Sequence, residues 1–527
     1  MASESLNSSH EDVHGRHQRP VENNTERISR TPYAAQAAAG AAAARAFFPL
    51  GYREGFSQWQ QPNTKSSLIC LTCITSPPTH LQTGNTTELP DGTTPTSLES
   101  ADPNQLGEVT TKSLDDPYGP RRWRSSMVEL SGQDRALNEF SVERIGEEAD
   151  QHLVMLHGYG AGLGFFYKNF EPLSRLKGWQ LHALDMLGMG RSTRPSFKIK
   201  AKEREDAIRE AEAWFVDALE EWRIKRKIDR FTLLGHSLGG YMAVAYALKY
   251  PGHLNKLILA SPVGIPEDPY AVTADVSEPP ASTLANEVTQ DERDIASSAA
   301  ILETAPKTSD GSFITGRQPV QADSAPAPRR NLPKWFAYLW DANISPFSLV
   351  RWTGPLGPRI VSGWTSRRFS HLPAEEAKAL HDYSYSIFSL RGSGEYALAY
   401  ILAPGAFARS PLIHRRPPHP VAASTTSSDP SAPARREKGF PVVFMYGDHD
   451  WMDVSGGHAA AARLDAEKRK ALEKATPEEQ RTDEGSSKVV VVNKAGHHLY
   501  LDGWEEFNSI VLTEMEEVSQ RERSRQS

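Results

Sequence analysis

Apolar residues follow two different spacings along this chain. Short apolar runs predict strands, and between residues 122 and 265 they occur at SMVELS, FSVERI, HLVMLHG, WQLHALDM, DRFTLLGHS and LNKLILASP. Apolar positions three and four residues apart predict helices near 165–176, over 201–226 and over GGYMAVAYALKYP. Because strands and helices alternate, we expect a mainly parallel central sheet with helices on both faces.

The same alternation returns near the C-terminus. FPVVFMYG and SKVVVVNKAG predict two more strands, with a charged helix over 459–476 between them and a final helix from near Gly503. The predicted helices of the segment 333–405 carry Trp335, Phe336, Trp340, Phe347, Trp352 and Trp364. An apolar helical segment inserted between late strands of a sheet is typical of a cap over an active-site mouth.

Composition divides the chain into four parts. Residues 1–115 are largely polar and are expected to be mostly disordered, and 116–265 and 440–527 are expected to form the two parts of the core. Residues 266–439 are expected to form the cap region, with disordered inserts at 267–330 and 411–439.

Two stretches of the N-terminal part are more specific. Residues 62–115 are rich in Thr, Ser, Pro and Asn, which predicts a linker. Residues 33–60 combine an Ala-rich helical stretch with an aromatic cluster, and two interpretations stay open. One is a helix packed on the core, and the other is an anchor in a membrane interface.

Charge and cysteine content argue against several classes of function. The net charge is −7, with both signs spread along the chain, and this does not favour a nucleic-acid partner. Cys70 and Cys73 have neither a second cysteine pair nor a nearby histidine pair to complete a zinc site. We therefore expect neither a metal nor a cofactor.

The hydropathy of the sequence bears on where in the cell the protein is located. The sequence contains no run of about 18 apolar residues, so a transmembrane helix is not expected. The first residues carry acids and lack the apolar centre of a secretory signal. We expect an intracellular protein that is soluble or rests on a membrane surface, with mitochondrion, cytoplasm and lipid droplet all open as locations.

The first chemical motif is Gly235-His236-Ser237-Leu238-Gly239, a G-x-S-x-G pattern between an apolar strand and an Ala-rich helix. This context is typical of the nucleophile elbow of α/β-hydrolases, where the turn is so sharp that glycine is needed on both sides of the serine. It predicts Ser237 as a nucleophile. A serine hydroxyl also needs a base that accepts its proton, and a histidine is therefore expected later in the chain.

The base is expected where the last strand ends. His497 comes directly after Ala-Gly in the loop KAGHHLYLD, at the sheet edge where Ser237 is also expected. His498 is the alternative, with the cap or solvent as its expected surroundings.

An acidic residue should orient the base, and three aspartates compete for that role. The strand PVVFMYG ends at Gly447 and is followed by Asp448, Asp450 and Asp453. Asp450, three residues past the glycine, has the spacing expected for contact with His497 Nδ1, and Asp453 is the alternative.

A tetrahedral intermediate also needs two backbone N–H donors. One is expected at Leu238, directly after the serine, and the other at Tyr159 in the loop HGYGAG, with Gly160 as the alternative. This loop lacks the Lys-Ser/Thr ending of a phosphate-binding P-loop and the spacing of a dinucleotide-binding loop.

With these motifs in place, the chain resembles the branch of α/β-hydrolases that contains cardiolipin-specific deacylases and lysophosphatidic-acid acyltransferase-like lipid regulators. The resemblance rests on FFPLGYREGFSQW, LHGYGAGLGFFYKNF, LDMLGMGRSTRP, TLLGHSLGGYMA, RGSGEYALAYILAPGAFARSPL, FMYGDHDWMD and AGHHLYLD, about half of the chain. It implies a phospholipid substrate and an H-x4-D acyltransferase signature at His497 and Asp502. From the residues themselves, Asp502 is better interpreted as the N-cap of the last helix, with Glu505 as its reciprocal glutamate.

Three functions follow as hypotheses. The leading one is a serine acyl hydrolase that acts on a phospholipid, cardiolipin or a related glycerophospholipid, through an acyl-enzyme on Ser237. The second is a lysophosphatidic acid acyltransferase that uses a lysophospholipid and acyl-CoA. The third is a non-enzymatic adaptor at a lipid droplet or membrane that binds a lipase, and the intact serine argues against it.

Overall fold

The computed structural model describes residues 50–60, 87–88, 108–111, 118–265, 343–403, 407–415, 438–452 and 454–526. The expectations for the N-terminal tail, the cysteine pair, the insert 267–330, most of the insert 411–439 and Asp453 fall outside these ranges.

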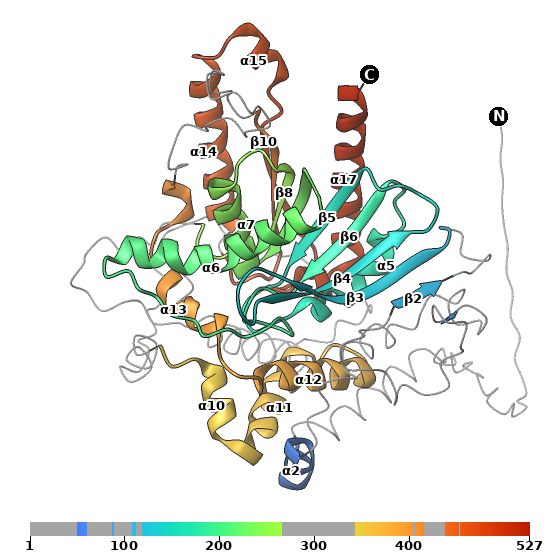
Figure 1. Cartoon of the computed structure of the whole chain (residues 1–527), viewed down its shortest axis with the longest axis vertical. Coiled ribbons are helices and arrows are strands. Elements are labelled where there is room, and N and C mark those ends of the chain that lie inside the picture. Colours follow the sequence, from blue (N-terminus) through green and yellow to red (C-terminus); the bar gives the residue numbers. More distant parts are fainter. Residues whose placement is uncertain are drawn as a thin grey trace, which may run out of the picture.

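One sheet of ten strands forms the centre of the molecule (Figure 1), in the order β1-β2-β3-β4-β6-β5-β7-β8-β9-β10. The strands are β1 Thr87–Glu88, β2 Glu108–Thr111, β3 Arg121–Glu129, β4 Ala136–Arg144, β5 Gln151–Leu156, β6 Trp179–Leu184, β7 Phe231–His236, β8 Leu254–Ala260, β9 Pro441–Gly447 and β10 Ser486–Val492. Strands β5 to β10 run parallel to their neighbours among themselves, whereas β1 to β4 are antiparallel. This confirms the predicted fold class, the α/β-hydrolase fold with a mainly parallel sheet.

The edge of the sheet differs from the prediction. The short strands β1 and β2 lie in the stretch 62–115 that the sequence assigns to a linker; β1 pairs with β2, and β2 pairs with β3. The backbone hydrogen bonds of an exposed sheet edge attract such segments without any apolar pattern, which is why composition does not reveal them.

Helices cover both faces of the sheet. The core contains η1 Leu163–Phe166, α5 Tyr167–Leu173, α6 Arg204–Lys225, α7 Leu238–Lys249, α14 Val454–Leu472, α15 Pro477–Thr482, α16 Leu499–Asp502 and α17 Trp504–Gln526. Side chains along β5 alternate between two apolar clusters, with Leu153 and Met155 on one face and Val154 and Leu156 on the other. The first cluster includes residues of α5 and α17, and the second includes residues of α6 and α7. Burial on both faces explains why the central strands are apolar throughout.

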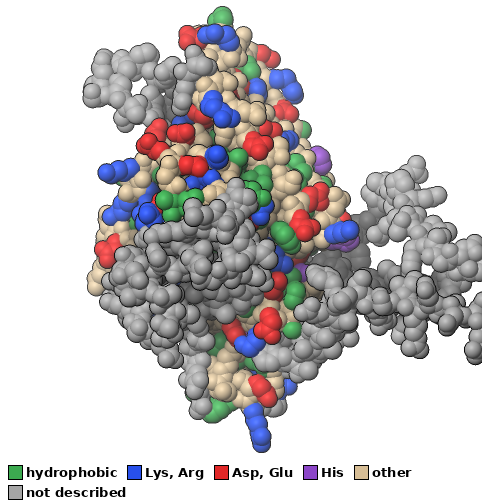
Figure 2. Space-filling view, turned by 90° about the vertical axis from the view of Figure 1, so that its right-hand side faces the viewer, with side chains coloured by type: hydrophobic (Ala, Val, Ile, Leu, Met, Phe, Trp, Pro, Cys, Tyr) green, Lys and Arg blue, Asp and Glu red, His purple; other side chains and the backbone are tan. Residues whose placement is uncertain are grey.

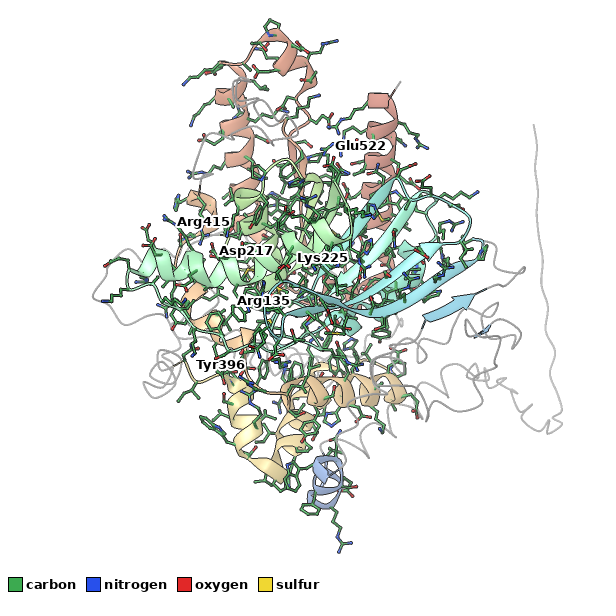
Figure 3. The ribbon with its side chains drawn as sticks, in the orientation of Figure 1. Arg135, Asp217, Lys225, Tyr396, Arg415 and Glu522 are labelled. Atoms are coloured by element: carbon green, nitrogen blue, oxygen red, sulfur yellow. The ribbon has the colours of Figure 1, made fainter. Side chains whose placement is uncertain are left out.

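The cap is inserted between β8 and β9. It comprises α10 Pro346–Trp352, η2 Gly354–Leu356, α11 Gly357–Arg368, α12 Ala374–Phe388, η3 Gly394–Ala397, α13 Leu398–Ile401 and η4 Leu412–His414. Figure 1 shows α10, α11 and α12 at one end of the molecule, away from α14 and α15. In Figure 3, Tyr396 of η3 lies where the cap meets the core, and Arg415, beyond η4, pairs with Glu212 of α6 at 2.6 Å.

The N-terminal helix α2, Tyr52–Gln60, is the described part of the stretch 33–60. It packs on the cap rather than on the sheet: the Leu50 N–H donates to Ser362 Oγ of α11 at 2.8 Å, and Gln58 Nε2 donates to Asp382 of α12 at 2.9 Å. Both contacts join segments that are more than 300 residues apart in the sequence. Hydrophobic periodicity is a local pattern and does not predict contacts at such a separation.

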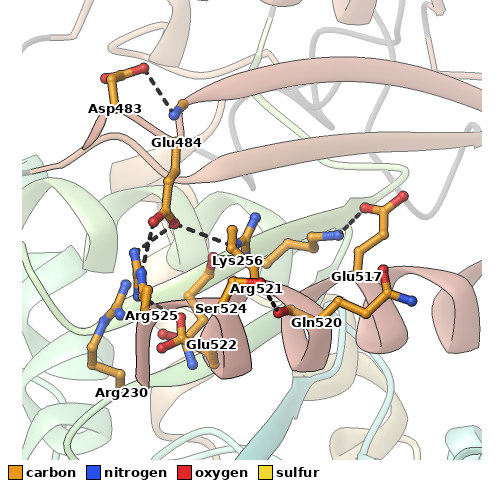
Figure 4. Close-up of polar contacts among 12 residues, drawn as sticks. Arg230, Lys256, Asp483, Glu484, Glu517, Gln520, Arg521, Glu522, Ser524 and Arg525 are labelled. Carbon is orange, nitrogen blue, oxygen red and sulfur yellow. Dashed lines mark hydrogen bonds and ion pairs between the residues drawn. The ribbon is translucent and has the colours of Figure 1, made fainter. Parts of the chain in front are cut away.

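The final helix α17 is fastened to the core by ion pairs that Figure 4 shows in detail. Lys256 of β8 reaches Glu517 at 2.6 Å, and Glu484 reaches Arg525 at 2.5 Å.

Elsewhere on the surface, acidic and basic side chains are mixed over the face of the core in Figure 2, as the small net charge of the sequence leads one to expect. Among the described helices there is none with the length and apolar character that crossing a membrane demands.

Candidate active site

The strand β7 and the helix α7 meet at Ser237 in a strained turn. Ser237 has φ 53° and ψ −115°, which is unfavourable for a residue with a side chain and typical of positions that the surrounding structure holds in place. A methyl group on Gly235 would lie 2.6 Å from the carbonyl carbon of Gly239, and one on Gly239 would lie 2.5 Å from the Leu156 carbonyl oxygen. Both glycines are therefore required by the tight approach of the backbone segments at the turn.

Asp450 and His497 meet at the ends of β9 and β10. Their Oδ1 and Nδ1 atoms are 3.2 Å apart, and the side chains are 0% and 4% exposed. The Asp450 carboxylate also accepts hydrogen bonds from the Met452 N–H at 3.0 Å and from Ser261 Oγ. Because each donor fixes the carboxylate, Asp450 can hold the imidazole in one orientation with the proton on Nδ1.

The backbone of His497 is tied to the elbow through His236, the residue before Ser237. His236 Nε2 donates to the His497 carbonyl at 3.0 Å, and the two rings have centroids 4.9 Å apart. Burial lowers the pKa of His236 well below its usual range, so this histidine is a neutral donor.

The other nitrogen of His497 is the available base. Nε2 is buried and has no hydrogen-bond partner among the described residues. Ser237 and His497 do not hydrogen bond to each other in this part of the structure, which is common in enzymes before substrate binds. The arrangement leaves Nε2 of His497 unpartnered in a loop that His236, the neighbour of Ser237, ties to the elbow.

A glycine-rich loop after β5 approaches the elbow from the other side. A methyl group on Gly158 would lie 2.8 Å from His236 Nδ1 and 3.0 Å from Ser237 Cβ, so only glycine allows this approach. Neither the Leu238 N–H nor the Tyr159 N–H has an acceptor within the ranges that the structure describes. Both are backbone donors next to the serine, as an oxyanion site needs.

Asp185 holds this loop and was not identified from the sequence. It is fully buried and accepts hydrogen bonds from the Leu163 N–H at 2.7 Å, the Arg191 N–H at 2.8 Å and Asn138 Nδ2 at 2.8 Å. A carboxylate at the end of the apolar strand WQLHAL is the signal that marks it, because a buried charge needs several donors.

A pocket lies between this loop and the cap, with about 300 Å³ of empty space that includes open solvent. Phe347 of α10 stacks on Tyr159 at 5.1 Å and on Phe388 at 4.4 Å, so the cap supplies an aromatic wall. Arg194 and Glu395 also line the pocket. The cap and the loop after β5 therefore form an aromatic wall with a few polar groups beside it.

The structure corrects the prediction that Asp502 caps the last helix. Asp502 ends α16, and α17 begins only at Trp504. Its carboxylate instead meets Arg368 of α11 at 3.2 Å and His371 at 3.2 Å, and accepts a hydrogen bond from the Gly496 N–H at 3.3 Å. Asp502 therefore joins the loop of His497 to the cap.

His498 also faces the cap, one of the two surroundings expected for it. Arg368 Nε donates to His498 Nδ1 at 3.1 Å, and the ring stacks on Phe165 at 6.0 Å. Burial lowers the pKa of His498 well below its usual range, with the Arg368 charge adding to the effect. Because Nδ1 of this neutral ring accepts from Arg368, its proton lies on Nε2, and His498 has no free basic nitrogen that could replace Nε2 of His497.

The Asp502 ion pair makes a prediction about stability. Replacing Asp502 with asparagine leaves Arg368 buried without its counter-ion, and we expect the free energy of unfolding at pH 7 to fall by about 3 kcal/mol. Burial alone would raise the pKa of Asp502, but the charge of Arg368 and the hydrogen bond from His371 bring it below its ordinary range. The difference in the free energy of unfolding between wild type and Asp502→Asn should therefore be at its full value above the unfolded-state pKa of about 4. It should shrink as the pH falls below that value. Urea unfolding of both proteins at several pH values measures this, and equal stability at pH 7 would contradict it.

Gly158 makes a prediction about turnover. Alanine at this position pushes the loop away from Ser237 and moves the Tyr159 N–H out of place, and we expect kcat to fall by about 100-fold. Gly363 in α11 has no atom within 4 Å of an added methyl group, so Gly363→Ala is the matched control. Steady-state kinetics on a soluble ester compares the two variants, and wild-type turnover in Gly158→Ala would rule out the close approach as a requirement.

Potential metal ligands do not cluster in the described residues: no group of three or more His, Cys, Asp or Glu side chains could hold an ion there.

Comparisons with known proteins agree with this architecture. A model of the α/β hydrolase fold matches residues 151–349. The 1-acylglycerol-3-phosphate O-acyltransferase of Arabidopsis thaliana is 32% identical over 402 residues, which cover 75% of this chain and 72% of that protein. The (lyso)-N-acylphosphatidylethanolamine lipase of Homo sapiens is 27% identical over 362 residues, 68% of this chain and 77% of the lipase. The 1-acylglycerol-3-phosphate O-acyltransferase ABHD5 of Homo sapiens is 27% identical over 364 residues, 68% of this chain and 76% of that protein.

Proposed function

Because this chain belongs to the α/β-hydrolase family, together with the 1-acylglycerol-3-phosphate O-acyltransferase of Arabidopsis thaliana, we propose that it is a serine acyl hydrolase. Its substrate is a glycerophospholipid of the cardiolipin type or a close relative, presented at a membrane surface inside the cell. The reaction passes through an acyl-enzyme on Ser237.

In the first half-reaction, Ser237 Oγ attacks the ester carbonyl while His497 Nε2 takes the hydroxyl proton. The carbonyl oxygen becomes an oxyanion, which the N–H groups of Leu238 and Tyr159 stabilise. The C–O bond to the glycerol then breaks, and His497 returns the proton to the leaving oxygen. The products of this step are a lysolipid and an acyl ester on Ser237.

In the second half-reaction, His497 deprotonates a water molecule that attacks the acyl-enzyme. The fatty acid leaves, and the proton returns to Ser237. Throughout, Asp450 holds the ring of His497 and stabilises its protonated form.

One observation carries this proposal: the 3.2 Å contact between Asp450 and His497, whose free Nε2 is buried on the side of the sheet where Ser237 is held at φ 53°. A strained serine whose neighbour, His236, binds the backbone of an oriented histidine has no structural use, whereas it is what nucleophilic catalysis needs. The aromatic pocket beside Tyr159 supports an acyl chain as the substrate group.

Acyl transfer to lysophosphatidic acid, with acyl-CoA as the donor, is the second candidate. The names of the plant and ABHD5 relatives favour it. It uses the same acyl-enzyme, and only the acceptor of the second half-reaction changes. In the H-x4-D signature, however, the carboxylate of Asp502 contacts Arg368, His371 and the Gly496 N–H, so His497 is oriented by Asp450 instead.

Product analysis separates these functions. Purified wild type and Ser237→Ala are incubated with a panel of phospholipids, with and without lysophosphatidic acid and acyl-CoA, and the lipids are identified by mass spectrometry. We expect free fatty acid and lysolipid that depend on Ser237. New phosphatidic acid without free fatty acid would favour the transferase, and the absence of any Ser237-dependent product would favour a lipase-binding adaptor.

A further inference from the structure

Exposed apolar side chains gather at the outer end of the cap. Six of them lie on α2, α10, η2 and α11: Phe56, Trp59, Leu349, Trp352, Leu356 and Ile360. We call these six residues the cap-tip patch. Trp352 is 68% exposed, the largest exposure among the big apolar side chains of the described residues. Figure 1 shows these elements together at the end of the molecule opposite α14 and α15.

Helical spacing makes the patch one surface. Phe56 and Trp59 are three residues apart on α2, and Leu349 and Trp352 are three apart on α10, so each pair lies on one side of its helix. A methyl group on Gly55, next to Phe56, would lie 3.7 Å from the Pro355 carbonyl oxygen, which places α2 directly beside Leu356 of η2.

The patch is set in a basic stretch of sequence. Residues 345–368 contain four arginines and no acidic residue, although the whole chain has a net charge of −7. Arg351 pairs with Glu395 at 2.6 Å and Arg368 with Asp502 at 3.2 Å, both toward the interior. The other two arginines of the stretch, Arg359 and Arg367, lie in α11, while Arg53 and Glu54 of α2 offset each other. Arginines around exposed tryptophan and leucine are the composition that binds anionic lipid surfaces.

The same helix connects the patch with the pocket. Phe347 at the start of α10 lines the pocket beside Tyr159, and Leu349 and Trp352 of that helix are exposed in the patch. Phe347 and Trp352 belong to one seven-residue helix, so a surface bound at the patch lies close to the wall of the pocket. A connection between the patch and the pocket serves the binding of a lipid surface, whereas the binding of a protein partner does not use it.

We propose that the cap-tip patch docks this protein on the surface of a phospholipid bilayer that contains anionic lipid, with Trp352 and Leu356 inserted among the headgroups. The docking surface deepens the proposed function, since it brings the pocket to the layer that holds the substrate, but binding itself does not require Ser237.

Vesicle binding of the full-length chain tests the proposal. Sedimentation with phosphatidylcholine vesicles, with and without phosphatidylserine, is compared for wild type and for Trp352→Ser combined with Leu356→Ser. Removing two inserted apolar side chains should weaken partitioning by about tenfold or more. Ile224 of α6 and Leu464 of α14 are also exposed, so Ile224→Ser with Leu464→Ser is the matched control, expected to bind within about twofold of wild type. Phosphatidylserine should strengthen wild-type binding in low salt.

A second measurement locates the insertion directly. Brominated phosphatidylcholine should quench part of the wild-type tryptophan fluorescence, and Trp352→Phe, which keeps an apolar ring, should bind normally and lose much of that quenching. Wild-type binding by the Trp352/Leu356 variant, or unchanged quenching in Trp352→Phe, would overturn the docking surface.

A soluble short-chain ester keeps this test separate from the proposed function. We expect the Trp352/Leu356 variant to hydrolyse that ester as wild type does, because neither side chain belongs to the site. If no variant hydrolyses any ester while vesicle binding still depends on the patch, the hydrolase function fails and the docking surface stands. If hydrolysis depends on Ser237 but vesicle binding is unchanged by substitutions in the patch, only the docking proposal is contradicted.

Discussion

Ser237→Ala should lower the turnover of a carboxylic ester by a factor of about 10⁴ or more, because the variant has no atom that can form the acyl-enzyme. Steady-state hydrolysis of a soluble ester and of a phospholipid measures the effect. Thermal unfolding should change little, since the hydroxyl of Ser237 makes no hydrogen bond in the described part of the chain.

Ser366→Ala is the matched control. It removes a hydroxyl that, within the described residues, bonds only to the Gly363 carbonyl, at 3.2 Å. Turnover should therefore stay within about twofold of wild type. Product formation by Ser237→Ala at the wild-type rate would exclude this serine as the nucleophile.

Asp450→Asn is expected to lower kcat by about 10³ to 10⁴. The aspartate accepts from His497 Nδ1 and the Met452 N–H through Oδ1 and from Ser261 Oγ through Oδ2, and asparagine removes its negative charge. The uncharged amide no longer stabilises the protonated imidazole that forms when His497 takes the proton of Ser237, so the attack of Ser237 slows.

The neighbouring aspartate gives the comparison for that variant. Asp448 accepts the Ala495 N–H through Oδ1 at 3.0 Å, a bond that asparagine retains, so Asp448→Asn should keep turnover within about threefold of wild type. Equal losses in the two variants would show a general disturbance of the loop after β9 rather than a role for Asp450 in orienting the base.

The sequence predicts those parts of the molecule that local chemistry specifies. Period-two and continuous apolar runs located the central strands, because a strand buried on both faces needs apolar side chains throughout. The G-x-S-x-G turn located Ser237, because the sharp turn admits only glycine at Gly235 and Gly239. The strand exits before Asp450 and His497 indicated which side chains meet at one edge of the sheet.

Contacts between distant segments could not be read in this way. Asp502 has the local pattern of a helix cap, yet its partner is Arg368, 134 residues earlier in the chain. In the same way, nothing near α2 indicates that its neighbours are Ser362 and Asp382 of the cap. Such pairs follow from how the cap folds onto the core, and a single sequence has no pattern that records them.

Covalent labelling of the nucleophile tests the central claim most directly. Purified wild type, Ser237→Ala and His497→Ala are incubated with a long-chain alkyl fluorophosphonate, and the adduct is located by mass spectrometry of proteolytic peptides. We expect one adduct, on Ser237, that forms quickly in wild type, at least about 100-fold more slowly in His497→Ala, and not at all in Ser237→Ala. An unlabelled wild-type protein, or an adduct that persists in Ser237→Ala, would contradict the account.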